Sequence, residues 1–172
     1  IISKLTKFII SEILHELKLL SKAKPVVISM SDLAASGGYF ISMTGDPVVA
    51  YPNTITGSIG VLYGKPNLHG LYDKLGIQKE LLTRGKLADI DSDYTNLSKA
   101  GHQKLHEGIV ATYKSFVTKV STARKKPYDQ IDCLAQGRVW MGAAAKNNGL
   151  VDESGGLDKA VGIERETGPG KP

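Results

Sequence analysis

The sequence has one cysteine, few aromatic residues and no long hydrophobic run. Cys133 is the one cysteine among 172 residues, so no disulfide bond can form within the chain. It lies in an apolar stretch with Ile131 and Leu134, and we expect it to be a small residue of the core. A lone cysteine neither supports nor excludes an extracytoplasmic compartment.

A membrane span and a nucleic-acid surface are both disfavoured. No stretch reaches the roughly 18 consecutive apolar residues that a span requires. The 22 basic and 17 acidic residues leave a net charge of only +5. The lysines are spread along the chain without aromatic residues between them, so we expect no nucleic-acid partner. The dense basic run at Arg124–Lys126 precedes Pro127, which is typical of the end of a helix.

Short β-branched runs alternate with amphipathic stretches, which is the pattern of an α/β fold with a parallel-type sheet. Strands are predicted at residues 26–30, 47–51, 56–61, 78–83 and 138–141. Helices are predicted before residue 24, over 68–75 and 98–124, after Pro127, over 142–148 and after 156. Apolar residues of the first helix recur at Leu5, Ile9, Ile13, Leu17 and Leu20, a face that should pack on the core. We expect one domain over residues 1–166 and a disordered tail over 167–172.

A serine between small residues marks the segment that follows the first predicted strand. Ser36 stands between two alanines and two glycines at a turn that leads into a helix. Small neighbours let a substrate backbone approach, and a helix N-terminus offers free amides to an oxyanion. The segment lacks the Gly-x-Ser-x-Gly pattern of hydrolase elbows. Taken by itself, it fits a packing motif of small residues equally well.

Four segments of the chain occur in a recognisable order and at recognisable distances: Leu33–Tyr39, Thr56–Val61, Gln136–Gly142 and Gly149–Asp152. Together they closely resemble the signal peptide peptidase A (protease IV) family. The resemblance covers residues from about 12 to 163. It implies a crotonase-like (ClpP-like) layered α/β fold, with a parallel-type sheet flanked by helices.

The resemblance also implies a site. In that family the serine matching Ser36 attacks the scissile carbonyl, and a desolvated lysine is the general base. Gly37 would supply an oxyanion amide and Ser58 would orient the lysine, while Gly38 and Tyr39 would bind substrate. No cofactor and no metal are implied.

Histidines fit a catalytic triad poorly, because each lies on a predicted helix: His15, His69, His102 and His106. His102 and His106 have the i, i+4 spacing of a zinc helix. No glutamate stands between them and no third ligand is evident, so we interpret them as a solvated helix face.

Two departures from the family pattern affect the expected activity. Single-repeat members carry the catalytic lysine where this chain has Ala88, and Lys86 is two residues too early. Long members have two repeats, and there the lysine comes from the N-terminal repeat while the serine lies in the C-terminal one. The family's Pro-Gly-Gly turn, which supplies an oxyanion donor, has no glycine counterpart at residues 4–10.

The sequence therefore predicts the serine-bearing half of a serine endopeptidase with a Ser/Lys dyad, which degrades released signal peptides and other apolar peptides. An N-terminal repeat would supply the lysine, and the protein would be a homo-oligomer. We expect the full-length protein to be membrane-associated, with this domain outside the bacterial cytoplasm or in the thylakoid. An inactive scaffold domain of the same fold is the alternative. An acyl-CoA enzyme of that fold is disfavoured, because such enzymes do not use a serine in this context.

Overall fold

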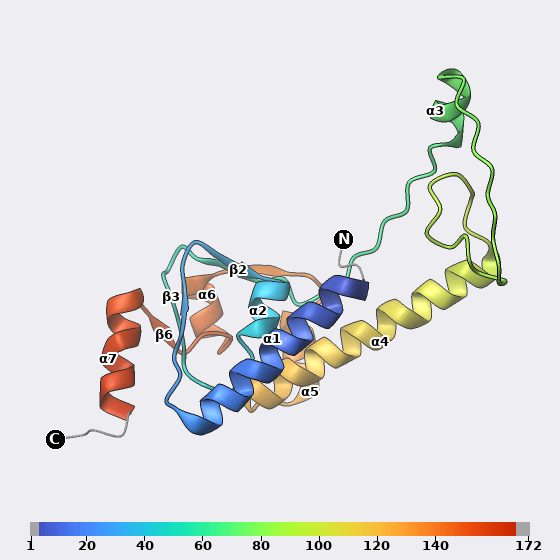
Figure 1. The fold of residues 1–172 in the computed structure, drawn as a ribbon. Coiled ribbons are helices and arrows are strands. Elements are labelled where there is room, and N and C mark those ends of the chain that lie inside the picture. Colours follow the sequence, from blue (N-terminus) through green and yellow to red (C-terminus); the bar gives the residue numbers. More distant parts are fainter. Residues whose placement is uncertain (1–3, 168–172) are drawn as a thin grey trace. The chain divides into compact units, whose positions relative to one another are not determined.

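The computed structural model describes residues 4–167. Two compact units are present (Figure 1): residues 62–112 form the smaller one, and the segments on either side of them form the larger one. Because the smaller unit interrupts the chain of the larger one, the units are not consecutive domains. The single domain expected over residues 1–166 stays a prediction. Of the tail expected at 167–172, residues 168–172 lie outside the described residues.

The larger unit is built on two three-stranded sheets. The first has the order β1-β3-β6 and is parallel throughout. Its strands are β1 (Ile28–Met30), β3 (Val48–Ala50) and β6 (Glu153–Ser154). All three residues of β3 are buried, as expected for the central strand of a parallel sheet. The α/β class with parallel strand pairing is therefore confirmed.

The second sheet has the order β2-β4-β5, with β2 and β4 parallel and β4 and β5 antiparallel. Its strands are β2 (Leu33–Ala35), β4 (Ile55–Gly57) and β5 (Val139–Met141). The expectation of a single sheet was thus wrong. Only two residues separate β1 from β2, and this short link passes the chain from one sheet to the other. The crotonase-like assignment in particular stays a prediction.

Helices enclose the core of the larger unit. They are α1 (Lys4–Ala23), α2 (Gly37–Ile41), the second half of α4 (Lys99–Arg124), α5 (Tyr128–Leu134), α6 (Gly142–Asn147) and α7 (Leu157–Thr167). Phe40 of α2 packs edge-on against Phe116 of α4, with ring centroids 5.1 Å apart. Leu14, Val120 and Ile131 join them in the buried cluster, so α1, α4 and α5 meet around α2.

Two details of the predicted core are corrected. The first helix exists as expected, but its buried face is formed by Leu14 with Ile10 packed beside it. Of the residues predicted to pack on the core, Ile9, Ile13 and Leu20 are exposed and Leu17 is half-buried. The side chain of Leu5 lies outside the described residues. Cys133 is exposed rather than buried, because α5 turns Ile131 into the core and places Cys133 on another side.

The smaller unit contains α3 (His69–Lys74), the first half of α4 and long extended segments. The strand predicted at 78–83 is absent: this segment pairs with no described strand, and Leu82 is 90% exposed. Side-chain contacts of Lys79 attach this segment to the rest of the smaller unit. Lys79 Nζ lies 2.7 Å from Asp93 Oδ1 and 4.1 Å from the centre of the Tyr72 ring.

Candidate active site

Ser36 occupies a strained turn between β2 and α2. Its φ of 52° and ψ of −111° are rare for a residue with a side chain and cost about 1–3 kcal/mol. Two hydrogen bonds hold this conformation: the Ser36 amide donates to the carbonyl of Gly57 at 2.8 Å, and the Phe40 amide donates to the carbonyl of Ser36 at 2.8 Å. The fold thus fixes a half-buried serine at a strand-to-helix turn, as nucleophile elbows do.

Ser58 is held beside Ser36 by the strand register. Ala35 of β2 pairs with Gly57 of β4, so the two serines follow at the same ends of adjacent parallel strands. Neighbouring strands lie about 4.8 Å apart. Ser58 also has a positive φ of 49°, and its amide donates to the carbonyl of Arg138 at 2.7 Å. Across residues 4–167, no hydrogen bond joins either hydroxyl to a basic side chain.

The two glycines after Ser36 have no packing reason to be glycine. A Cβ on Gly37 would come no closer than 3.8 Å to Ile10 Cγ2, and one on Gly38 would lie 4.0 Å from Ala34. Both distances are ordinary contacts, and neither residue has a positive φ. Glycine destabilises a helix by up to about 1 kcal/mol relative to alanine. Their amides open α2 and have no intrahelical acceptor, so this bare backbone suits the approach of a substrate carbonyl.

Gly37→Ala should therefore stabilise the fold and impair the site. We expect the free energy of unfolding to rise by up to about 1 kcal/mol. The rate of labelling by a fluorophosphonate should fall, because the new methyl group crowds the oxyanion position. Urea denaturation and labelling of the protein encoded by the whole gene would measure the two effects. Gly70→Ala in α3, where a Cβ would meet nothing within 4 Å, is the matched control and should leave labelling unchanged.

Glycines of the second and third motifs allow two backbones to touch. A Cβ on Gly60 would lie 2.8 Å from the backbone of Gly137, whose amide donates to the carbonyl of Ile59 at 3.0 Å. A Cβ on Gly57 would lie 2.8 Å from Cδ1 of Trp140. These contacts press the loop after β4 against the start of β5 and so fix the position of Ser58.

The fourth motif is joined by hydrogen bonds to the start of β3 and to the end of α4. The Asp152 carboxylate accepts hydrogen bonds from the Val48 amide at 2.8 Å and from Arg124 Nη1 at 2.9 Å. Arg124 Nε also donates to the carbonyl of Gly149 at 3.1 Å. The basic run at 124–126 does end a helix, as expected. The Arg124 side chain is only 8% exposed and pairs with Asp152, which no local pattern in the sequence indicated. The one available signal was the acidic residue at the end of the fourth motif, because a partly buried carboxylate needs a partner.

Tyr39, in α2, also contacts the fourth motif. Its side chain is fully buried, and its hydroxyl donates to the carbonyl of Leu150 at 2.8 Å. Burial raises the pKa of Tyr39 well above its usual value, so the hydroxyl remains a donor at all ordinary pH values. The Tyr39 hydroxyl is thus occupied by Leu150, and Gly38 is half-buried. The substrate roles expected for both residues stay predictions.

Tyr39→Phe should lower stability without affecting the chemistry. It leaves the buried carbonyl of Leu150 without this donor, so we expect a loss of about 1–2 kcal/mol in the free energy of unfolding. Fluorophosphonate labelling should proceed at the parent rate. A large drop in labelling by a folded Tyr39→Phe protein would show instead that the hydroxyl takes part in the reaction.

The other residues that the sequence raised as site candidates are distributed over both units. Ala88 and Lys86 are exposed residues in turns of the smaller unit. The four histidines are exposed on helices α1, α3 and α4. Residues 4–10 form the first turns of α1 and contain no glycine. Across the part of the chain that the structure describes, no helix has both the length and the apolar content to cross a membrane.

Comparison with known proteins places this site in context. The model of peptidase family S49 matches residues 18–167. The chain is 41% identical over 153 residues to the chloroplastic serine protease SPPA of Arabidopsis thaliana, and 44% identical over 138 residues to protease 4 of Salmonella typhi. It is 34% identical over 152 residues to a putative signal peptide peptidase SppA of Enterococcus faecium. These alignments take in 88%, 80% and 88% of the chain, but only 23%, 22% and 44% of the relatives.

Proposed function

The chain belongs to peptidase family S49, as its four motifs predicted, and we propose that it is the serine-bearing part of a longer peptidase that cleaves signal peptides and other apolar peptides. Ser36 would attack the scissile carbonyl, and the amide of Gly37 would stabilise the oxyanion. Ser58 would hold the amine of a lysine that acts as the general base. The strained, doubly hydrogen-bonded turn at Ser36 is the observation that carries this proposal.

An exposed apolar face on the sheet that leads into Ser36 supports the choice of substrate. Leu33, Ile55 and Met141 are register partners across β2, β4 and β5, and their side chains are 68%, 42% and 49% exposed. This row crosses the sheet at the first residue of β2, and Ser36 follows directly after the last residue of that strand. β2 is also an edge strand of its sheet, and an extended peptide binds such an edge by backbone hydrogen bonds. Apolar side chains of the peptide would then lie on the exposed row.

We propose that an N-terminal repeat of the full-length protein supplies the lysine base. Ser36 and Ser58 share the larger unit, and position 88 in the smaller unit holds alanine. The chain spans only about a quarter of the length of its relatives in Arabidopsis and Salmonella, which leaves room for a second repeat. We propose membrane association of the full-length protein on the same family basis.

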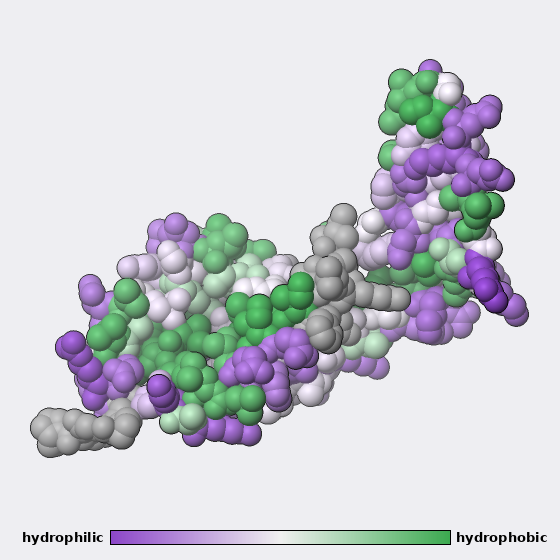
Figure 2. Space-filling model, viewed as in Figure 1, coloured by the Kyte–Doolittle hydropathy of each residue, from purple (hydrophilic) through white to green (hydrophobic). Residues whose placement is uncertain are grey.

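Assembly with further copies or with the other repeat is part of the proposal. Exposed apolar side chains are Ile9, Ile13, Leu19 and Leu20 on α1, and Leu62, Leu71, Leu75, Ile77 and Leu82 in the smaller unit. Figure 2 shows hydrophobic side chains gathered along α1 and around α3. Contiguous apolar surface of this kind marks an interaction site. Light scattering should therefore find an oligomer, and a monomer at high concentration would contradict this part of the proposal.

Peptidase assays on two proteins test the function. The protein encoded by the whole gene should cleave an apolar, extended peptide, whereas the 172-residue chain alone should show little or no cleavage. Robust, Ser36-dependent cleavage by the 172-residue chain would refute the proposal that another repeat supplies the lysine base. Absence of cleavage by the whole-gene protein would favour the alternative, a scaffold domain that has lost the chemistry.

A further inference from the structure

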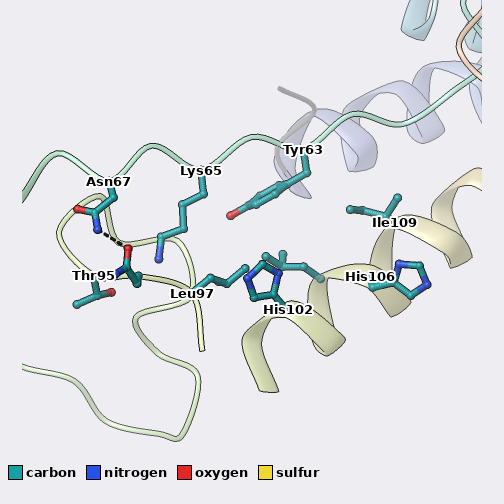
Figure 3. A pocket seen from close by; sticks show the side chains of 10 residues that line it. Tyr63, Lys65, Asn67, Thr95, Leu97, His102, His106 and Ile109 are labelled. Atoms are coloured by element: carbon teal, nitrogen blue, oxygen red, sulfur yellow. Dashed lines mark hydrogen bonds between the residues drawn. The ribbon is translucent and has the colours of Figure 1, made fainter. Parts of the chain in front are cut away.

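The smaller unit contains a hollow of about 480 Å³ that the peptidase chemistry does not use. One wall is the extended segment that carries Tyr63, Lys65 and Asn67, and the other walls are the loop at 95–97 and the start of α4. Figure 3 shows Lys65 reaching from the extended segment toward this loop, with His102 and His106 on the helix below. All of the lining residues belong to the smaller unit.

Lys65 is the unusual residue of this hollow. Its Nζ atom is shielded from solvent and has no hydrogen-bond acceptor among the described residues. A buried ammonium group without a partner is strongly unfavourable, so such groups are almost always paired. An unsatisfied buried donor in a native fold therefore calls for an explanation, and a bound ion is one of the standard ones.

Charges around the hollow favour an anion. None of the ten lining residues is acidic, and Lys65 is basic. Asp91 and Asp89 are not lining residues, and their carboxylates accept hydrogen bonds from the lining residues Tyr63 at 2.9 Å and Thr95 at 3.3 Å. In the described part of the chain, no group of three or more His, Cys, Asp or Glu residues could hold a metal ion.

The asparagine pair adds an oriented donor. The His69 amide donates to Asn67 Oδ1 at 2.9 Å, and Asn67 Nδ2 donates to Asn96 Oδ1 at 2.6 Å. This chain of bonds uses the oxygen of each amide and leaves Nδ2 of Asn96 available to donate. Ammonium, amide and imidazole N–H groups together are donors that suit the several acceptors of one oxyanion.

We propose that this hollow binds a small oxyanion, a carboxylate or a phosphate, held chiefly by Lys65 Nζ. Asn96 Nδ2 and the imidazole of His102 complete the set of donors. This inference does not depend on Ser36 and concerns a different unit of the fold.

Calorimetric titration of the 172-residue chain in a Tris chloride buffer tests it, with inorganic phosphate and succinate as separate probes. Binding of phosphate alone, of succinate alone or of both supports the proposal and identifies the source of the oxyanion. Lys65→Met and Asn96→Ala should each weaken that binding, the former by about tenfold or more. Lys74→Met, which changes an exposed lysine outside the hollow, should bind like the parent. If neither probe binds, or if Lys65→Met binds as tightly as the parent, the proposal is wrong.

Thermal denaturation shows whether Lys65 binds a ligand or only stabilises the fold. Without oxyanions, Lys65→Met should melt at a higher temperature than the parent, because it removes an unpaired buried charge. Adding the bound probe should raise the melting temperature of the parent but not of Lys65→Met. A Lys65→Met protein that melts below the parent in the absence of oxyanions would overturn the proposal.

Discussion

Ser36→Ala, introduced into the protein encoded by the whole gene, should lower kcat for an apolar peptide by about 10⁴-fold or more. The hydroxyl is the attacking group in the proposed mechanism, and the loss of a nucleophile removes a whole reaction path rather than one interaction. KM should change little, because the exposed row on β2, β4 and β5 is untouched. Steady-state peptidase kinetics would measure both constants.

Ser29→Ala is the matched control for this prediction. Ser29 is an exposed serine in β1 of the same unit, outside the turn and outside the second sheet. It should leave kcat and KM at the parent values. A Ser36→Ala protein that retains near-parental turnover would mean that another residue performs the attack.

Asp152→Ala should be strongly destabilising, lowering the free energy of unfolding by about 3 kcal/mol at pH 7. Arg124, whose side chain is 8% exposed, would lose its carboxylate partner and remain as a buried, unpaired charge. The amide of Val48, the first residue of β3, would lose its hydrogen-bond acceptor as well. Urea denaturation would measure the loss. Glu12→Ala, at an exposed carboxylate of α1, is the control and should change stability little.

Stability should also depend on pH through Asp152. Burial opposes ionisation of its carboxyl, but hydrogen bonds from Arg124 and the Val48 amide outweigh this effect and hold the pKa below its usual value. A pKa that folding depresses contributes stability above the unfolded pKa of about 3.9 and loses it as the pH falls through the folded pKa. Because the Asp152 side chain is 41% exposed, solvent screening limits this contribution.

The parent and Asp152→Ala should therefore differ most at neutral pH, and the difference should shrink as the pH falls below about 4. Urea denaturation of both proteins between about pH 3 and pH 7 would test this. A stability difference that stays constant over that range would show that the Asp152 charge is not involved.

The helices and most strands of the fold were predictable because their signals are local. The stretch at 98–124 shows helical periodicity at Tyr113, Phe116 and Val120, and these residues do pack on the core. The buried face of α1 was misassigned because adjacent apolar residues, such as Ile9 and Ile10, form two stripes that fit the same period. Only packing against α2 decides between the two stripes.

Features that depend on distant partners were the ones that sequence reasoning missed. β2 has three small or apolar residues and is a strand only because β4 pairs with it. The segment 78–83 has the composition of a strand, but no described strand pairs with it. Likewise, Arg124 and Asp152 are 28 residues apart, and no local pattern joins them.

The residues of the candidate site were only partly predictable from the sequence. The sequence alone left Ser36 evenly balanced between a nucleophile and a packing residue, and the resemblance to a peptidase family decided for the nucleophile. The pairing of β2 with β4 then gives a physical reason why Ser58 belongs with Ser36. The source of the lysine base and the contacts of Gly37 with substrate stay predictions.

Mapping of a fluorophosphonate adduct by mass spectrometry tests the identity of the nucleophile most directly. The protein encoded by the whole gene would be labelled, digested and sequenced, with the Ser36→Ala protein treated in parallel. We expect one adduct, on the peptide that contains Ser36, and none in the Ser36→Ala protein. An adduct on a different serine in this chain, or equal labelling of the Ser36→Ala protein, would contradict the assignment of Ser36.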